Sequence, residues 1–315
     1  MASRCNFGFA KNQKLSPEDA MSLDNFIIIV YCLVDDVLKK ALNGAKLRQR
    51  GMEPKLSDAE IITMEIVGEF LGIDTDKGIW YYFHQHWLKW FPDLGSRTNF
   101  VKQAANLCMV KQKIQRTVAK QLGAFDDTLH MADGFPMPVC KFRRANFSRI
   151  FRGEASYGFC ASKGETYYGF KGNVMINAEG VVANITVTAA NIDERESLWD
   201  ITNNVTGLVI ADKGLIGADY QKEQKNAGIN LQTPKRSNMT DDRGKKFNRW
   251  LVSTRRLVET VIGQFAAQFH IEKIWARDLW HLTNRVARKV LAHTIGMLVN
   301  KMMGNPPLQF ELILT

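Results

Sequence analysis

Along the first part of the chain, apolar residues recur at the three- and four-residue spacing of amphipathic helices, from about residue 16 to residue 125. One predicted helix begins at Ser16-Pro17-Glu18, where Ser can cap the first turn and Pro fits within it. Another begins at Ser57, and Glu60 three residues later completes a capping box. The pattern therefore predicts a helical N-terminal region.

From about residue 127 to residue 235 the pattern changes to short runs rich in Val, Ile, Thr and Tyr, which are typical of strands. Gly or Asn turns separate these runs, and Asn-Ala-Glu-Gly at 177–180 predicts a hairpin between the second and the third. The five predicted strands are TLHMAD (128–133), YYGFKGNVMINAEG (167–180), VVANITVTAAN (181–191), GLVIAD (207–212) and INLQTP (229–234).

Predicted helices follow the third and fourth strands, at 193–205 and 218–228, and the chain is helical again from Lys245 to near its end. An antiparallel meander followed by strand–helix–strand crossovers gives a mixed sheet with helices packed on it. The predicted fold class is therefore α/β, with a helical N-terminal region.

The composition favours a soluble protein with a polyanionic partner. Hydrophobic residues make up 45% of the chain, and 42 Lys and Arg against 32 Asp and Glu give a formal charge of +10. This excess favours nucleic acid first and an acidic membrane surface second. The longest apolar run, at 26–34, has nine residues, whereas a membrane-spanning helix needs about 20. Five scattered cysteines predict free thiols in a reducing cytoplasm.

Two aspartates stand at corresponding places in the predicted strands. Asp133 and Asp212 each end an apolar strand, in Ala-Asp followed by Gly or Lys-Gly. If the first and fourth strands are parallel neighbours, the two carboxylates meet at one edge of the sheet, where ligand sites of open α/β sheets lie. Each aspartate alone is explained equally well as a turn residue or a helix cap. The repeated pattern favours a functional pair.

A third acid, Glu259, lies beside the apolar stripe of a predicted helix, with Arg255 four residues before it. An ordinary ion pair on a helix surface would explain this spacing too. Two strand aspartates and a helix glutamate nevertheless supply the hard oxygen ligands that Mg²⁺ prefers. Two such ions about 4 Å apart can hold the attacking and leaving oxygens of a phosphoryl displacement. His84 and His86 lie in an aromatic-rich helical region and are interpreted as structural or DNA-facing.

Five stretches, taken in order, resemble DDE transposases of bacterial insertion sequences, and the similarity runs from about Lys55 to the C-terminus. They are residues 131–147, 167–201, 209–217, 228–239 and 253–277. The resemblance implies an RNase H-like catalytic domain in which Asp133, Asp212 and Glu259 are the catalytic triad and the metal ligands. Related branches carry Tyr and Lys along the glutamate helix, where this chain has Val252 and Ala266.

The resemblance also implies the organisation and the reaction. Residues 1–125 are expected to bind DNA ends or to dimerise, 126–275 to form the catalytic domain, and 276–315 to form a helical extension. Two Mg²⁺ ions, replaceable by Mn²⁺, would support hydrolysis at the transposon ends and attack of the freed 3′-OH on target DNA. Partners would be double-stranded DNA and further copies of the chain, as a homodimer or larger, in a bacterial cytoplasm near the nucleoid. A nuclease that cuts without joining, and a domesticated DNA-binding protein without catalysis, are the alternatives.

Candidate DNA contacts lie beside the predicted acids. Cations crowd the stretch after Asp133, interleaved with phenylalanines that we interpret as core, and more precede or lie on the glutamate helix. The predicted DNA-binding residues are Lys141, Arg143, Arg144, Arg149, Arg152, Lys235, Arg236, Arg255 and Arg256. The helix at 57–70 is acidic, which makes it a poor surface for reading DNA.

Overall fold

The computed structural model describes residues 21–48, 50–51, 53–161, 163–215, 218–235, 239, 241–273 and 275–314. The predicted helix start at 16–18 lies outside these residues. No helix in the described part of the chain combines the length and apolar character needed to cross a membrane.

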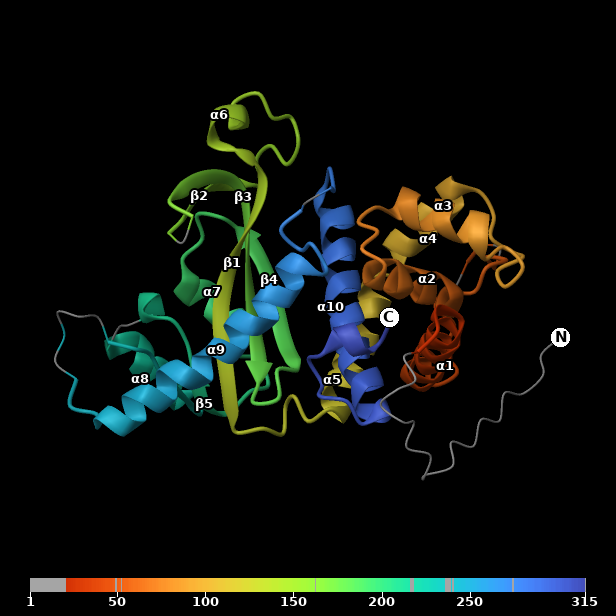
Figure 1. The fold of residues 1–315 in the computed structure, drawn as a ribbon. Helices are drawn as coiled ribbons and strands as arrows, with labels where there is room; N and C mark the ends of the chain where they lie inside the picture. Colours follow the sequence, from red (N-terminus) through yellow and green to blue (C-terminus); the bar gives the residue numbers. More distant parts are fainter. Residues whose placement is uncertain are drawn as a thin grey trace.

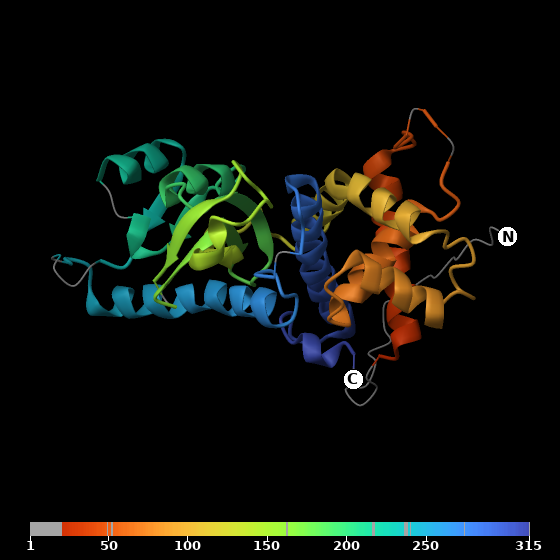
Figure 2. The same ribbon diagram turned by 90° about the horizontal axis from the view of Figure 1, so that it is seen from above.

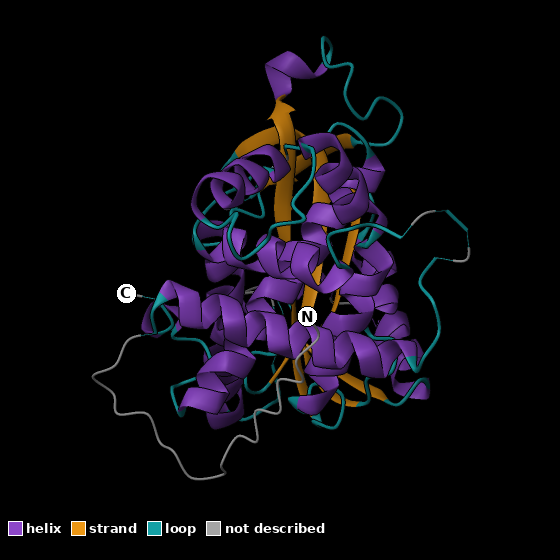
Figure 3. Cartoon of the chain, turned by 90° about the vertical axis from the view of Figure 1, so that its right-hand side faces the viewer, coloured by secondary structure: helices purple, strands orange, loops and turns teal. Residues whose placement is uncertain are grey.

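Five helices form the N-terminal region, and Figure 3 shows them gathered on one side of the molecule. They are α1 Leu23–Leu42, α2 Asp58–Phe70, α3 Asp76–His86, α4 Arg97–Asn106 and α5 Cys108–Gln121. The predicted capping box of α2 is confirmed, because Ser57 Oγ accepts from the Glu60 backbone N–H at 3.2 Å and Ser57 N–H donates to Glu60 Oε2 at 2.7 Å. The prediction of a helical region here is confirmed.

The sheet confirms the predicted α/β class. Its strands are β1 Leu129–Lys141, β2 Ser156–Cys160, β3 Glu165–Asn177, β4 Val182–Ala189, β5 Gly207–Ile210 and β6 Ile229–Gln232. They lie in the order β2-β3-β1-β5-β6, and β4 pairs with β3 beyond the stretch that pairs with β2. β1 is antiparallel to β3 and parallel to β5, so the meander and crossovers form an RNase H-like mixed sheet.

Helices cover both faces of this sheet (Figures 1 and 2). α9 Lys245–Ala267 crosses one face, where Met131 and Ile210 share a core with Leu251 and Val258. α7 Glu194–Ile201 and α8 Ala218–Asn226 lie on the other face, over a second core that includes Ala132 and Val209. Because strand side chains alternate between faces, neighbouring residues of β1 enter different cores.

α10 Leu279–Met303 stands between the sheet and the N-terminal helices (Figure 2). It packs against α2 and α5, and nearly all its residues from Val286 to Asn300 are buried. The chain after Lys245 is therefore two helices, α9 and α10, separated by residues 268–278.

Two expectations about the strands were wrong. Asp133 does not end its strand, because β1 continues to Lys141 and Asp133 pairs with Val174 of β3. Gly134 and the prolines at 136 and 138 follow Asp133 inside the strand, and beyond Met131 the described residues pair with β1 only on its β3 side. Proline is tolerated at such an edge. β2 was not predicted, since its five residues include an exposed Tyr and Phe with no alternation of apolar and polar positions.

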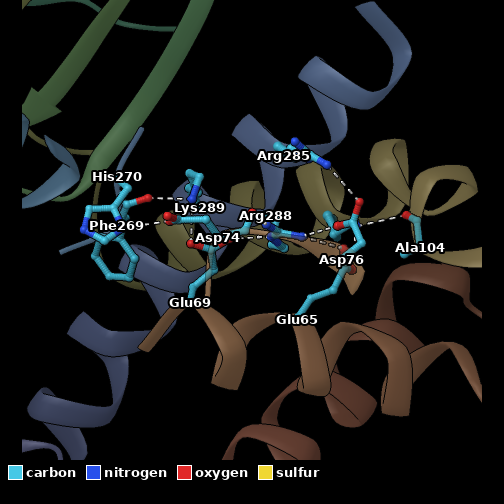
Figure 4. Close-up of polar contacts among 11 residues, drawn as sticks. Glu65, Glu69, Asp74, Asp76, Ala104, Phe269, His270, Arg285, Arg288 and Lys289 are labelled. Carbon is cyan, nitrogen blue, oxygen red and sulfur yellow. Dashed lines mark hydrogen bonds and ion pairs between the residues drawn. The ribbon is translucent and has the colours of Figure 1, made fainter. Parts of the chain in front are cut away.

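Charged side chains are buried where α2, α3, α5 and α10 meet (Figure 4). Each is at most 5% exposed, and together they are Glu65, Glu69, Asp76, Lys111, Arg288 and Lys289, which we call the buried charge network. The interpretation of α2 as an acidic surface is thus wrong for Glu65 and Glu69, which point into the protein.

Each member of this network has an oppositely charged partner. Lys111 Nζ donates to Glu65 Oε2 at 2.5 Å, Arg288 Nη1 donates to Asp76 Oδ1 at 2.5 Å, and Arg288 Nε donates to Glu69. Burial raises the pKa of Glu65 and lowers that of Lys111, because a charge is poorly solvated there. Although burial opposes its charge, the surrounding carboxylates raise the pKa of Arg288.

The network also reaches the chain that follows α9. Lys289 Nζ donates to Glu69 Oε2 at 2.8 Å and to the Phe269 backbone carbonyl at 2.5 Å. The next residue, His270, places Nδ1 2.7 Å from Asp74 Oδ1. Two polar contacts therefore tie the end of α9 to the N-terminal helices.

Removing one partner of the network is expected to be far more harmful than removing a surface charge. Lys111→Met leaves the Glu65 carboxylate buried without its hydrogen-bonded cation, so the free energy of unfolding should fall by about 3–5 kcal/mol. Urea-induced unfolding followed by circular dichroism measures this loss. The matched control is Lys39→Met, which removes an exposed i,i+4 partner of Asp35 and should cost less than about 1 kcal/mol. Equal effects of the two substitutions would contradict this account.

Candidate active site

The parallel pairing of β1 and β5 brings the two predicted aspartates together. Their ladder ends with Met131 opposite Ile210, and Asp133 and Asp212 each lie two residues beyond that pair. Strand side chains repeat every two residues, so Asp133 continues the face of Met131, which is the face that α9 covers. The condition that these two strands are parallel neighbours is therefore met.

One guanidinium, that of Arg255 on α9, contacts all three predicted acids. Arg255 Nη2 donates to Asp133 Oδ2 at 2.7 Å and lies 3.3 Å from Asp212 Oδ1, and Nη1 donates to Glu259 Oε1 at 3.1 Å. The Arg255–Glu259 contact is the i,i+4 helix pair that the spacing allowed. Three carboxylates from two strands and one helix thus converge on a single cation.

The three acids differ in exposure. The side chain of Asp133 is 17% exposed, that of Asp212 38% and that of Glu259 52%. Burial raises the pKa of Asp133 above its usual range, and the Arg255 guanidinium offsets part of that rise. The Gly134 backbone N–H donates to Asp133 Oδ1 at 2.8 Å. Asp133 is therefore the enclosed end of a site whose other end, at Glu259, is open to solvent.

A cavity of about 20 Å³ adjoins the aspartates, with Asp133, Asp212, Asn173 and Glu194 among its lining residues. Asn173 is 5% exposed, and its Nδ2 has no hydrogen-bond partner among the described residues. A Cβ added to Gly214 would stand 2.9 Å from Glu194 Oε2 and 3.8 Å from Asp212 Oδ2, so a larger residue here would displace the Glu194 carboxylate. Glu194 lies in the first turn of α7.

Sequence reasoning missed Asn173 and Glu194 as neighbours of the acids. Asn173 lies within a strand, and Glu194 reads as an ordinary acid in the first turn of a helix that Asp193 caps. The sequence signal for a second acid near Asp212 was Gly214, two residues later, since a glycine near an acid allows another group to approach closely.

Comparison with known protein families decides the identity of this region. Residues 124–279 match the family model of the transposase DDE domain. The protein carries a DDE transposase domain. The matched segment contains all six strands together with α7, α8 and α9, and so contains Asp133, Asp212 and Glu259.

Two further comparisons were made. A piggyBac transposase synaptic complex with hairpin DNA, determined by cryo-electron microscopy, aligns with 96% of this chain and 72% of its own, at 10% identity and a TM-score of 0.39. No curated protein sequence gave a significant match.

DDE transposase domains generally use divalent metal ions, and the donor set here fits such an ion in its chemistry. All three acids supply carboxylate oxygens, the ligands that Mg²⁺ and Mn²⁺ prefer. Within the described residues, no three Asp, Glu, His or Cys side chains are spaced to hold a metal, and Arg255 lies between the acids. Its Nε is buried without a hydrogen-bond partner in this part of the structure, so the guanidinium is incompletely bonded.

The predicted DNA contacts of the transposase domain lie in three places. Those at 141–152 are exposed on the end of β1, on α6 Phe142–Ala145 and on the loop after it. Lys235 after β6 and Arg256 on α9 are exposed, whereas Arg255 points into the acids. Arg236 lies outside the described residues.

The interpretation of the nearby phenylalanines as core holds only for Phe151, which is 3% exposed. Phe142 and Phe147 are 56% and 85% exposed. They lie on α6 and in the loop after it, which stand clear of the sheet (Figure 1).

Arg255 is expected to compete with divalent metal for the three acids. In Arg255→Gln the carboxylates lose the cation that they share, so Mn²⁺ should bind at least about fivefold more tightly, since a unit charge some 4 Å away is worth about 1 kcal/mol or more. Titration of Mn²⁺ followed by electron paramagnetic resonance measures the affinity without any reaction.

The control is Arg256→Gln, which removes the adjacent exposed arginine and should leave Mn²⁺ affinity unchanged. Without metal, Arg255→Gln should also unfold at a lower temperature than the Arg256→Gln variant, because its acids repel one another. Mn²⁺ binding to Arg255→Gln no tighter than to the wild type would show that the guanidinium does not occupy the metal's place.

Proposed function

We propose that the protein is a DNA transposase that hydrolyses phosphodiester bonds at the ends of its element and joins the freed 3′-OH to target DNA. The observation that supports this most is the convergence of Asp133, Asp212 and Glu259 on Arg255 inside a transposase DDE domain. The proposed reaction transfers a phosphoryl group from one oxygen to another and needs no covalent link to the protein.

Asp133, Asp212 and Glu259 would hold two Mg²⁺ ions, which Mn²⁺ would replace. When bound, such ions stabilise the charge on the attacking and leaving oxygens. Asp133, supported by the Gly134 N–H and partly buried, would give the site a fixed, poorly hydrated end. Glu259 would close it from α9, on the solvent side.

Arg255 would have two partners in turn. In the metal-free protein it neutralises part of the charge of the three acids. When metal ions are bound to those acids, the guanidinium would be available to pair bidentately with two oxygens of a DNA phosphate. In this scheme Arg255 contacts DNA only when metal ions are bound to the three acids.

The DNA would follow the exposed cations. Those at 141–152 lie beyond Asp133 along β1, and Lys235 and Arg256 add charge near β6 and on α9. Such contacts position the backbone and carry no sequence information, so recognition of the ends falls to other parts of the chain. We assign end recognition or dimerisation to residues 1–125, catalysis to 126–275, and a helical extension to 276–315.

Joining two element ends requires both in one complex, so a homodimer or larger assembly on DNA is proposed, acting in a bacterial cytoplasm. In this scheme each transposase domain acts on one end.

The decisive experiment is strand cleavage of DNA that carries the element's ends, with Mg²⁺ or with EDTA. Asp212→Asn keeps the size of the side chain and removes the charge that holds the metal, so cleavage should fall by at least about 100-fold. Asp200→Asn, on the exposed side of α7, is the matched control and should cleave like the wild type. Denaturing gels of end-labelled DNA measure both cleavage and joined product.

Each other outcome would favour a different function for this protein. Cleavage by Asp212→Asn at the wild-type rate would reject the triad. Cleavage by the wild type without joined product would favour the nuclease that cuts without joining, and DNA binding without cleavage would favour the protein that has lost catalysis.

A further inference from the structure

An exposed aromatic surface projects from the transposase domain at the far end of β1. Figure 1 shows α6 and its loop standing clear of the sheet. Four rings there are exposed, and we call them the aromatic tip: Phe142 (56%), Phe147 (85%), Tyr157 (43%) and Phe159 (66%). Large apolar side chains gathered at one exposed place usually mark a surface that binds something.

The tip is anchored to the fold. The rings of Phe142 and Tyr157 have centroids 5.5 Å apart, and those of Tyr157 and Tyr168 lie 5.4 Å apart. Tyr168 Oη donates to the carbonyl of Phe151, whose ring is buried against Phe170. Buried aromatics therefore hold Tyr157 and, through it, Phe142 in place, and Phe147 is the most exposed of the four rings.

The charges around the tip define its partner. No acid occurs between Gly134 and Gly153, and the cations of this stretch, all exposed, are Lys141, Arg143, Arg144, Arg149 and Arg152. Five cations beside exposed rings would repel a basic partner and would suit a polyanion that offers flat apolar faces. Nucleic acid with unstacked bases has both properties, because phosphates pair with the cations and bases stack on the rings.

We propose that the aromatic tip stacks on unpaired bases of the bound element end, with Phe147 as the principal stacking residue. β1 runs unbroken from Asp133 to Lys141, which at about 3.3 Å per residue places the tip roughly 26 Å from the triad. Along a DNA strand that corresponds to about eight nucleotides from the cleaved bond. The proposal rests on the proposed function, in that the DNA is the transposase's own substrate.

The test is binding in EDTA, where no cleavage is needed, of end DNA carrying 2-aminopurine in an unpaired segment about eight nucleotides from the cleavage site. Stacking quenches the fluorescence of this base. The wild type should quench it, and Phe147→Leu, which keeps an apolar side chain without a ring, should lose the quenching and bind about five- to 150-fold more weakly. Phe147→Trp should retain both. Fluorescence anisotropy of the same DNA measures the affinity.

Matched controls separate stacking from general loss. Trp280→Leu removes a ring that is 52% exposed near the start of α10, outside the residues assigned to DNA, and it should change neither quenching nor affinity. Thermal unfolding should be the same for all Phe147 variants, because the side chain makes little contact with the fold. Wild-type binding of fully paired DNA should be weaker than binding of the unpaired substrate, and that difference should vanish in Phe147→Leu.

Three results would overturn the proposal. Phe147→Leu could quench the fluorescence and bind like the wild type. Phe147→Trp could lose the quenching and the affinity to the same extent as Phe147→Leu. Alternatively, sedimentation of the DNA-free proteins could show a wild-type dimer that Phe147→Leu loses, which would make the tip an interface between copies. A wild type that quenches but never cleaves would leave stacking intact and reject the transposase reaction, so the two failures are distinguishable.

Discussion

The buried charge network is the constraint on which the arrangement of the two halves depends. It contains three acids and three bases, each at most 5% exposed, from four helices that are far apart in sequence. A charge removed from water is tolerated only with its partner beside it, so α2, α3, α5 and α10 cannot slide past one another without separating ions. Apolar packing alone accepts small shifts far more readily. The network therefore fixes the register of α10 against the N-terminal helices.

That constraint extends to the helix that carries Glu259. Lys289 belongs to the network and also donates to the Phe269 carbonyl, just after α9 ends. Glu259 lies ten residues before Phe269, or about 15 Å along a helix. The two aspartates are positioned separately, by the parallel pairing of β1 and β5. The candidate site is therefore assembled from a sheet and from a helix that the N-terminal half holds in place.

The balance of charge differs between the network and the candidate site. In the network three acids face three bases, and Arg285 adds a further cation 3.3 Å from Asp76. Around Arg255 three acids face one guanidinium, which leaves an excess of two negative charges at a place that is partly open to solvent. The first arrangement carries no excess of negative charge. The second has capacity for added positive charge, which is the physical basis for treating it as a metal site and the network as structural.

The sequence predicted those features that depend on local pattern. Runs rich in Val, Ile, Thr and Tyr identified the strands of the meander, the Ser57 capping box identified α2, and the repeated Ala-Asp pattern linked two acids that do lie beside neighbouring parallel strands. It failed where tertiary context decides. The first strand was predicted to end at Asp133, although a strand with one free edge accepts the glycine and the two prolines that follow. Likewise Glu65 and Glu69 look like surface acids in the sequence, because the bases that pair with them lie 46 and 220 residues further along the chain.

The misjudged length of β1 has the largest functional consequence. A strand that ended at Asp133 would leave the following cations and phenylalanines in a loop with no fixed relation to the acids. Since β1 continues to Lys141 and stays paired with β3, one paired strand joins Asp133 to the segment that begins the aromatic tip. DNA held at the tip is then held at a fixed distance from the triad. The strand would serve as a spacer as well as a support, and the choice of bond to cleave would depend on where bases leave the duplex.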